Sequence, residues 1–334
     1  MTVDCAYYAN GVRQPLAPTT LAEAAETPHR GGHYLWIELD EPAPGVMEDL
    51  CRHFDLHQLA VEDAAQAHQR PKVEAYDGFH LVIYKTTRWS AERREVEVGE
   101  LAIFVGAGYV IVVRHGATPG AARARKRLEA HPELSKTGPA AAVWSILDVV
   151  VDDYFPVVEG LEDEVEELEL AVFDGRDDLT ERSYQLKQQL NEIYRAVHPL
   201  LPPLESIEGG AFPQIDPGLK RYFRDIADHV RLLQDEVLGL REQLSNALEA
   251  NFALMGVRQN EITAQQNQTV KQLTIIATVF LPLTFVTGFF GQNFGWLVDQ
   301  ISSPAAFAIL GLGGLLLPAA ALYVWFRRTG LAQR

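Results

Sequence analysis

Two long apolar runs near the C-terminus constrain this chain more than any other feature of its sequence. Residues 273–290 carry no charged side chain, and these about 18 residues are enough to cross a bilayer core as a helix. Residues 305–326 form a second run of this kind, which is more uniformly apolar. In the first run, threonines and small residues recur near helical spacing: Thr274, Ala277, Thr278, Thr284, Thr287 and Gly288. This stripe is typical of a membrane helix that packs on copies of itself around a wet path.

The charges around the two runs predict how they are oriented. Lys271 precedes the first run, Arg327 and Arg328 follow the second, and the loop between them carries only Asp299. Because positive residues favour the cytoplasmic side of a membrane, we expect both termini in the cytoplasm and the connecting loop outside. The first run ends in the amide-rich turn Gly291-Gln292-Asn293, which we expect to lie at a pore mouth.

Composition excludes some functions and favours others. The 334 residues carry a net charge of −16, which disfavours a nucleic-acid partner because phosphate binding needs clustered Lys and Arg. An acidic chain suits the handling of cations, although most such carboxylates are solvated surface.

Cys5 and Cys51 lie far apart, so we expect reduced cytosolic thiols, and the N-terminus shows no signal-peptide pattern. No Walker loop, metalloprotease, nucleophile-elbow or kinase motif is present, so we do not expect an enzyme or a membrane-anchored sensor.

Three domains are expected: a cytoplasmic α/β domain over 1–135, a helical region over 136–270 and a membrane domain over 271–334. In the first, β-branched and aromatic residues predict strands at 6–8, 34–39, 79–86, 96–105 and 109–114. Helices are expected at 45–54, 56–67 and 119–130. Gly106-Ala107-Gly108 lacks the third glycine of a phosphate loop and leads into a strand, so it predicts a hairpin turn.

The pattern turns helical from about residue 140. One helix is expected over 140–173, with an acidic run that is usually a solvated face. A second helix is expected over 178–207, which Pro202-Pro203 should kink or end. A third should run from about 217 into the first membrane span, roughly 110 Å in all. Its apolar residues alternate four and three apart, as in a coiled-coil seam: Ile226, Val230, Leu233, Val237, Leu240, Leu244, Leu248, Phe252 and Met255.

Several segments carry a resemblance to one family. The run Phe-Leu-Pro-Leu-Thr-Phe at 280–285, followed by Gly-Phe-Phe-Gly-Gln-Asn-Phe at 288–294, resembles the first transmembrane helix of CorA-type divalent-cation transporters. That family usually has Gly-Met-Asn where this chain has Gly291, Gln292 and Asn293. Segments 36–42, 55–63 and 69–74 are similar to the family's cytoplasmic domain.

The resemblance implies an α+β fold assembled as a funnel-shaped homopentamer in a bacterial-type plasma membrane, with the first span lining the axis. It implies uptake of Mg²⁺, and possible uptake of cobalt or nickel, driven by membrane potential, with no organic cofactor. Gly291, Gln292 and Asn293 would form the selectivity motif. A regulatory divalent ion would lie between neighbouring subunits on Asp63 and Asp225, and acidic helices below the membrane could concentrate cations.

A helical projection of the first span and the residues before it gives the expected pore lining. One stripe contains Asn267, Val270, Thr274, Thr278 (or Ala277), Leu281, Thr284 and Gly288. Val270 and Leu281 would form apolar constrictions that close by dewetting. The altered motif leaves open a zinc transporter with proton coupling, resembling ZntB. His53 and His57, four residues apart, would allow a metal pair, but no third ligand stands at a suitable spacing.

Overall fold

The computed structural model describes residues 4–15, 17–27, 32–118, 121–176, 179–211, 215–292 and 294–328. The chain divides into two compact units, Met1–Asn251 and Phe252–Arg334, and a single helix, α10 (Lys220–Phe290), contributes to both. The boundary at residue 251 lies within the helical region that the sequence predicts for 136–270. Both candidate membrane runs fall in the second unit.

A seven-stranded sheet forms the centre of the first unit, with strand order β2-β1-β3-β7-β6-β5-β4. β3 and β7 pair in parallel, and the other neighbours are antiparallel. The strands are β1 (Asp4–Ala9), β2 (Val12–Arg13), β3 (His33–Asp40), β4 (Lys72–Tyr76), β5 (Phe79–Ser90), β6 (Glu95–Gly106) and β7 (Tyr109–Gly116). The five predicted strands are confirmed, and the antiparallel pairing of β6 with β7 confirms the hairpin at 106–108.

Both faces of the sheet are buried. Successive residues of a strand point to opposite faces, and in the central strands the residues of both sets are apolar. In β6, Ile103 faces one core and Phe104 faces the other. Helices α1 (Leu21–Glu26), α2 (Pro44–Phe54) and α3 (Gln58–Gln66) cover the Phe104 face. The predictions for 45–54 and 56–67 are confirmed in position.

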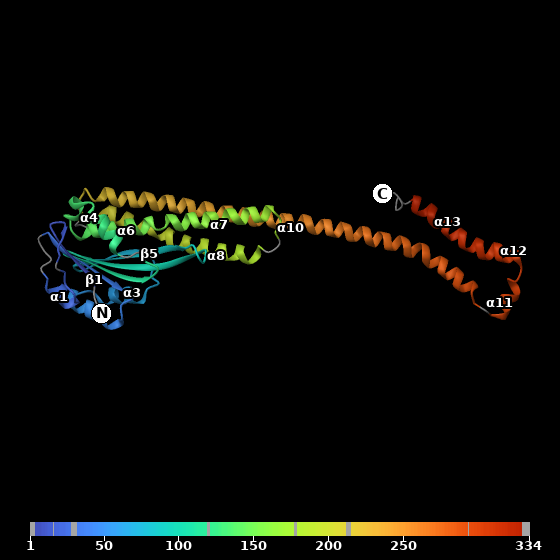
Figure 1. The fold of residues 1–334 in the computed structure, drawn as a ribbon, viewed down its shortest axis with the longest axis horizontal. Coiled ribbons are helices and arrows are strands. Elements are labelled where there is room, and N and C mark those ends of the chain that lie inside the picture. The colour runs from blue at the N-terminus through green and yellow to red at the C-terminus, as the bar shows by residue number, and fades with distance from the viewer. Residues whose placement is uncertain are drawn as a thin grey trace. The chain divides into compact units, whose positions relative to one another are not determined.

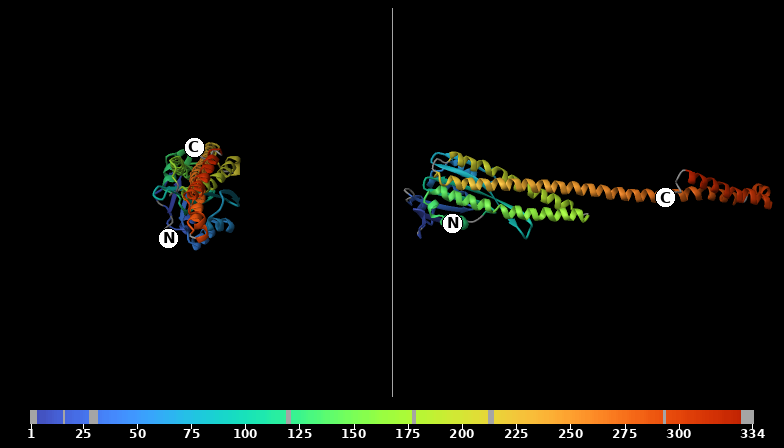
Figure 2. Two further views of the ribbon diagram at one scale, coloured as in Figure 1. Left: turned by 90° about the vertical axis from the view of Figure 1, so that its right-hand side faces the viewer. Right: turned by 90° about the horizontal axis from the view of Figure 1, so that it is seen from above.

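A larger helical layer covers the opposite face (Figure 1). Its helices are α4 (Ala121–Glu129), α5 (Pro132–Ser135), α6 (Pro139–Asp152), α7 (Phe155–Phe173), α8 (Thr180–Val197), α9 (Leu201–Ser206) and the first part of α10. Figure 2 shows α7 and α8 running beside α10. The contacts agree: the rings of Phe155 and His229 lie 5.9 Å apart, and Arg241 lies over Tyr194 at 4.3 Å.

The structure corrects two of the helix predictions, and prolines explain both differences. The helix expected over 140–173 is two helices, α6 and α7, separated at Asp153 and Tyr154. Pro156 explains the break, since it has no N–H and its ring would meet the carbonyl four residues earlier. The helix expected over 178–207 ends as an α-helix at Val197, just before Pro199, and continues as the 3₁₀ turn His198–Leu200, then α9, then the π-helical turn Ile207–Ala211.

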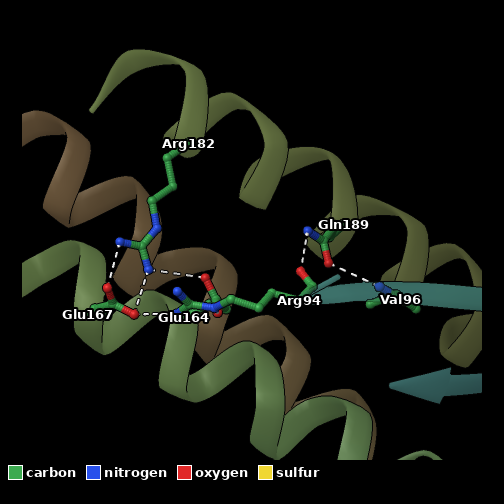
Figure 3. Close-up of polar contacts among 6 residues, drawn as sticks. All are labelled: Arg94, Val96, Glu164, Glu167, Arg182 and Gln189. Atoms are coloured by element: carbon green, nitrogen blue, oxygen red, sulfur yellow. Dashed lines mark hydrogen bonds and ion pairs between the residues drawn. The ribbon is translucent and has the colours of Figure 1, made fainter. Parts of the chain in front are cut away.

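The tip of the β5–β6 hairpin is fixed to α7 and α8 by paired charges (Figure 3). Arg182 donates hydrogen bonds to Glu167 at 3.0 Å and to the buried Glu164 at 3.1 Å, and Arg94 contacts both carboxylates. Gln189 bonds the carbonyl of Arg94 at 3.2 Å and the N–H of Val96 at 3.1 Å. Two members of the predicted acidic run are therefore neither free solvated charges nor available to concentrate cations.

This cluster predicts a loss of stability in acid. Hydrogen bonds from Arg182 and Arg94 lower the pKa of Glu167 to about 2, below its value of about 4.3 in an unfolded chain. The stabilisation is thus complete above about pH 4.3 and is lost as the pH falls towards 2. Because Glu167 is half exposed, we expect about 0.5–1 kcal/mol. In thermal unfolding, the unfolding temperature of Glu167→Gln should lie below that of wild type at pH 6, and the two temperatures should converge near pH 2.

The neighbouring exposed Glu166 offers a control for that experiment, since Glu166→Gln removes one charge from the same acidic run. A difference between wild type and Glu167→Gln that persists unchanged down to pH 2 would contradict the assignment.

In the second unit, α10 continues to Phe290 and is followed by α11 (Gly295–Gln300), α12 (Pro304–Ala306), the π-helical turn Phe307–Leu312 and α13 (Gly313–Arg328). Two segments, α10 and Pro304–Arg328, are long and apolar enough to cross a membrane. The predicted helix from about 217 into the first span is confirmed. Its apolar seam is buried only to Leu244, with Leu248 partly covered; Phe252 and Met255 are exposed in the single chain.

Candidate functional site

The predicted selectivity motif stands where α10 ends. α10 ends at Phe290, and its last helical hydrogen bond runs from the N–H of Gly291 to the Thr287 carbonyl, four residues earlier, at 2.9 Å. The N–H of Gln292 bonds the Phe289 carbonyl at 3.3 Å, and both motif residues are exposed. Asn293 lies outside the described residues. Glycine suits this position, since a Cβ at Gly291 would lie 3.1 Å from the Thr287 carbonyl oxygen.

The predicted pore stripe lies largely on the open side of α10. The partly covered residues of the span recur three and four apart: Ile275, Thr278, Val279, Pro282, Leu283, Val286 and Phe290. Val286 and Phe290 lie closest to Gly314 of α13, so this face packs towards the second span. Thr278 is the one member of the predicted stripe that lies on this partly covered face. The other members are exposed and thus available to line an axis shared with other copies: Asn267, Val270, Thr274, Leu281, Thr284 and Gly288.

The threonine hydroxyls of the span all use their protons within the helix. Thr274, Thr278 and Thr284 donate to the carbonyl four residues earlier, at 2.8, 2.7 and 2.8 Å. On the exposed face, the hydroxyl oxygens of Thr274 and Thr284 then present only lone pairs outward. Such oxygens accept hydrogen bonds from the waters around a cation, which suits passage of a hydrated ion.

Asp63, the first of the two predicted regulatory ligands, lies on α3 next to an ammonium group. Lys72 Nζ donates to Asp63 Oδ2 at 2.7 Å and to Glu74 Oε1 at 2.8 Å. Partial burial alone would lower the pKa of Lys72, but the hydrogen bonds and charges of Asp63 and Glu74 raise it above its usual value. The ammonium therefore stays charged between the two carboxylates. The sequence analysis missed Lys72, although it stands in the matched segment 69–74.

Asp225, the second predicted ligand, is exposed on α10 beside another carboxylate. Burial raises the pKa of Asp148 on α6, the pairing with Arg127 opposes that rise, and Asp225 adds to it. Arg127 bonds both Asp148 and Asp152, the latter at 2.7 Å. Asp225 thus adds negative charge next to an ion pair that is already in place.

The structure does not bring Asp63 and Asp225 together within one chain. α3 belongs to the layer on one face of the sheet, whereas α10 belongs to the layer on the other. An ion bound to both would need Asp63 from one copy and Asp225 from another. Within the described residues, no group of three or more His, Cys, Asp or Glu side chains is arranged to hold a metal.

The histidine pair His53 and His57 is not a metal site in this fold. His53 lies on α2, while His57 caps α3 and its Nδ1 accepts the N–H of Leu59 at 3.2 Å. Asp55, with a left-handed backbone at φ 51°, separates the two helices. The four-residue spacing therefore does not correspond to one helix face.

An α/β unit, two helices long and apolar enough to cross a membrane, and exposed hydroxyl and amide oxygens along the first of these helices are features expected of a membrane protein that passes ions. A family model described as CorA-like Mg²⁺ transporter protein matches residues 31–328. The chain belongs to the CorA family of divalent metal ion transporters.

Individual proteins are also similar to this chain over most of its length. The Bacillus subtilis protein YfjQ is 31% identical over 89% of this chain and 89% of its own length. The cobalt/magnesium transport protein CorA of Thermotoga maritima is 28% identical over 81% of this chain and 77% of that protein. The solved CorA magnesium transporter of Methanocaldococcus jannaschii matches 99% of both chains with a TM-score of 0.65 at 20% identity, which supports the fold.

Proposed function

We propose that this protein is a magnesium channel, also open to cobalt or nickel, that admits ions down the membrane potential. The observation that carries the proposal is the oxygen-bearing face of α10, which leads to Gly291 and Gln292 at the helix end. Mg²⁺ holds its water shell tightly and favours oxygen ligands, so hydroxyl, amide and carbonyl oxygens can bind the hydrated ion. A divalent ion crossing 100 mV gains roughly 4.6 kcal/mol, twice the single-charge value.

Two spans per chain enclose no path, so a channel requires several copies around one axis. We propose the homopentamer that the family resemblance implies, with the open face of α10 inward and both termini cytoplasmic. Asn293 would complete the selectivity motif, and Val270 and Leu281 would form the constrictions. The domain division 1–135, 136–270 and 271–334 remains our proposal for the functional parts.

Regulation would follow from a divalent ion held between Asp63 of one copy and Asp225 of the next. The placement of these residues on opposite layers of one chain supports an ion shared between copies. An ion that binds the closed ring better than the open one closes the channel. Without it, the carboxylates repel each other and the closed ring loosens.

A zinc transporter coupled to protons is the second candidate. The zinc transport protein ZntB of Pectobacterium atrosepticum is 24% identical over 78% of this chain, and Gln292 replaces the methionine usual in CorA proteins. This alternative predicts zinc entry that stops when the pH gradient is removed.

Uptake into proteoliposomes loaded with a magnesium-sensitive dye distinguishes the two. Under an inside-negative potential, we expect magnesium entry that disappears when the potential is collapsed and is absent from protein-free vesicles. Zinc entry that follows an imposed proton gradient, without magnesium entry, would overturn the magnesium proposal and support the alternative.

A further inference from the structure

One cation of the chain itself, the Lys72 ammonium, already lies against Asp63. This ammonium lies 2.7 Å from Asp63 of α3 and 2.8 Å from Glu74 of β4, so one cation serves carboxylates from two elements. Tyr76 also donates to the other oxygen of Glu74, at 3.0 Å, which holds that carboxylate in place. The negative charge of Asp63 is thus balanced within its own chain.

This ammonium is held in a place that a second subunit could reach. β4 is the last strand of the sheet, and the side chains of Lys72 and Asp63 are about a third exposed, at 27% and 30%. A lysine carries its charge on a flexible four-carbon stem, so the ammonium can withdraw without a change in the strand. A carboxylate that binds this ammonium can exchange the ammonium for a metal ion. The ammonium and the metal ion cannot both stay close to the carboxylate, because their positive charges repel each other.

We propose that Lys72 is a built-in competitor of the regulatory divalent ion, which must displace the ammonium from Asp63 before the ion can bind. The inference rests on the proposed regulatory role of Asp63. In this scheme Lys72 stabilises the ion-free state by neutralising Asp63 and Glu74. It also sets the ion concentration at which the channel closes, so that closing requires more magnesium than the carboxylates alone would need.

The test follows thermal unfolding of the full-length protein in detergent while Mg²⁺ is titrated, since an ion that binds only the folded protein raises the unfolding temperature. In Lys72→Met, we expect a lower unfolding temperature without Mg²⁺. We also expect half of the full Mg²⁺ response at roughly tenfold lower concentration, equivalent to about 1.4 kcal/mol.

Glu74→Gln provides an independent variant with the opposite sign. Without the Glu74 charge, Asp63 is the remaining carboxylate that binds the ammonium, and one negative charge near the ion is lost. The Mg²⁺ concentration that gives half of the full response, the Mg²⁺ midpoint, should therefore rise by roughly threefold or more. Lys136→Met is the matched control: Lys136 bonds the exposed Glu133 on α5, and the loss of its charge should leave the midpoint within about twofold of wild type.

Asp63→Asn separates failure of this inference from failure of the proposed function. If Asp63→Asn abolishes the Mg²⁺ response while Lys72→Met leaves the midpoint unchanged or raises it, the regulatory site stands and competition by Lys72 is overturned. If Asp63→Asn responds like wild type, the regulatory site itself is wrong, and the role of Lys72 falls with it. If Lys72→Met does not fold, an unchanged or lowered midpoint in Glu74→Gln still overturns the competition.

Discussion

Asn293→Ala is expected to reduce potential-driven magnesium entry into proteoliposomes by roughly tenfold or more. A hydrogen bond to a charged group contributes about 1.5–3 kcal/mol, and a tenfold change corresponds to about 1.4 kcal/mol. In a symmetric channel the substitution removes one amide from every copy at once, so the loss should be at least that of a single contact. The measurement is the initial rate of dye response at a fixed inside-negative potential.

Gln300→Ala supplies the matched control for that variant. Gln300 ends α11, is exposed and also carries a side-chain amide, but it lies outside the motif. Its entry rate should match that of wild type when equal amounts of folded protein are reconstituted. Undiminished magnesium entry in Asn293→Ala would show that the motif is not the selective mouth of the channel.

The elements with strong local signals could be predicted from the sequence. In β7, the run of β-branched residues from Val110 to Val113 is buried on both faces, and such a run is typical of a central strand. The long α10 was predictable because residues 217–290 hold few helix-breaking residues and join an apolar seam to an apolar span. Gly106 and Gly108 marked the turn between β6 and β7.

Two features of the fold were missed although each has a local signal. β4 carries the charged residues Lys72 and Glu74 among its five positions, which hides a strand pattern, but the turn Asp77-Gly78 that joins it to β5 is typical of a hairpin. The break before α7 had a local signal in Pro156, but the apolar pattern of 140–173 continues across it. Periodicity reports which residues face a core, and a short break between two packed helices leaves that pattern intact.

For the candidate site, the sequence indicates the kinds of residue but not which side chains lie next to them. The stripe on α10 follows from helical spacing alone, and its role as a pore lining stays a prediction. That Lys72 bonds Asp63 could not be inferred, since α3 and β4 meet only through the folding of the sheet edge. The pairing of Glu164 with Arg94, 70 residues apart, is long-range in the same sense.

The packing of α7 against the β5–β6 hairpin predicts a large loss of stability on substitution of Gly160. Gly160 is buried in α7 directly over the indole of Trp89, and a Cβ there would lie 2.4 Å from Trp89 Cε2. Real Cβ atoms do not approach so closely, so Gly160→Leu must push the rigid indole aside and part α7 from β5. Overpacking of this kind costs about 3 kcal/mol, which lowers the unfolding temperature by roughly 6–12 °C.

Two variants make that prediction specific to the Trp89 contact. Gly239 on α10 is exposed, with no heavy atom within 4 Å of an added Cβ, so Gly239→Leu should be neutral or stabilise the helix by up to about 1 kcal/mol. Combining Gly160→Leu with Trp89→Ala should recover part of the loss, because the smaller side chain leaves room for leucine. The coupling measured in this double-mutant cycle should be about 1–3 kcal/mol. Strictly additive effects would mean that α7 does not depend on glycine to pack against the hairpin.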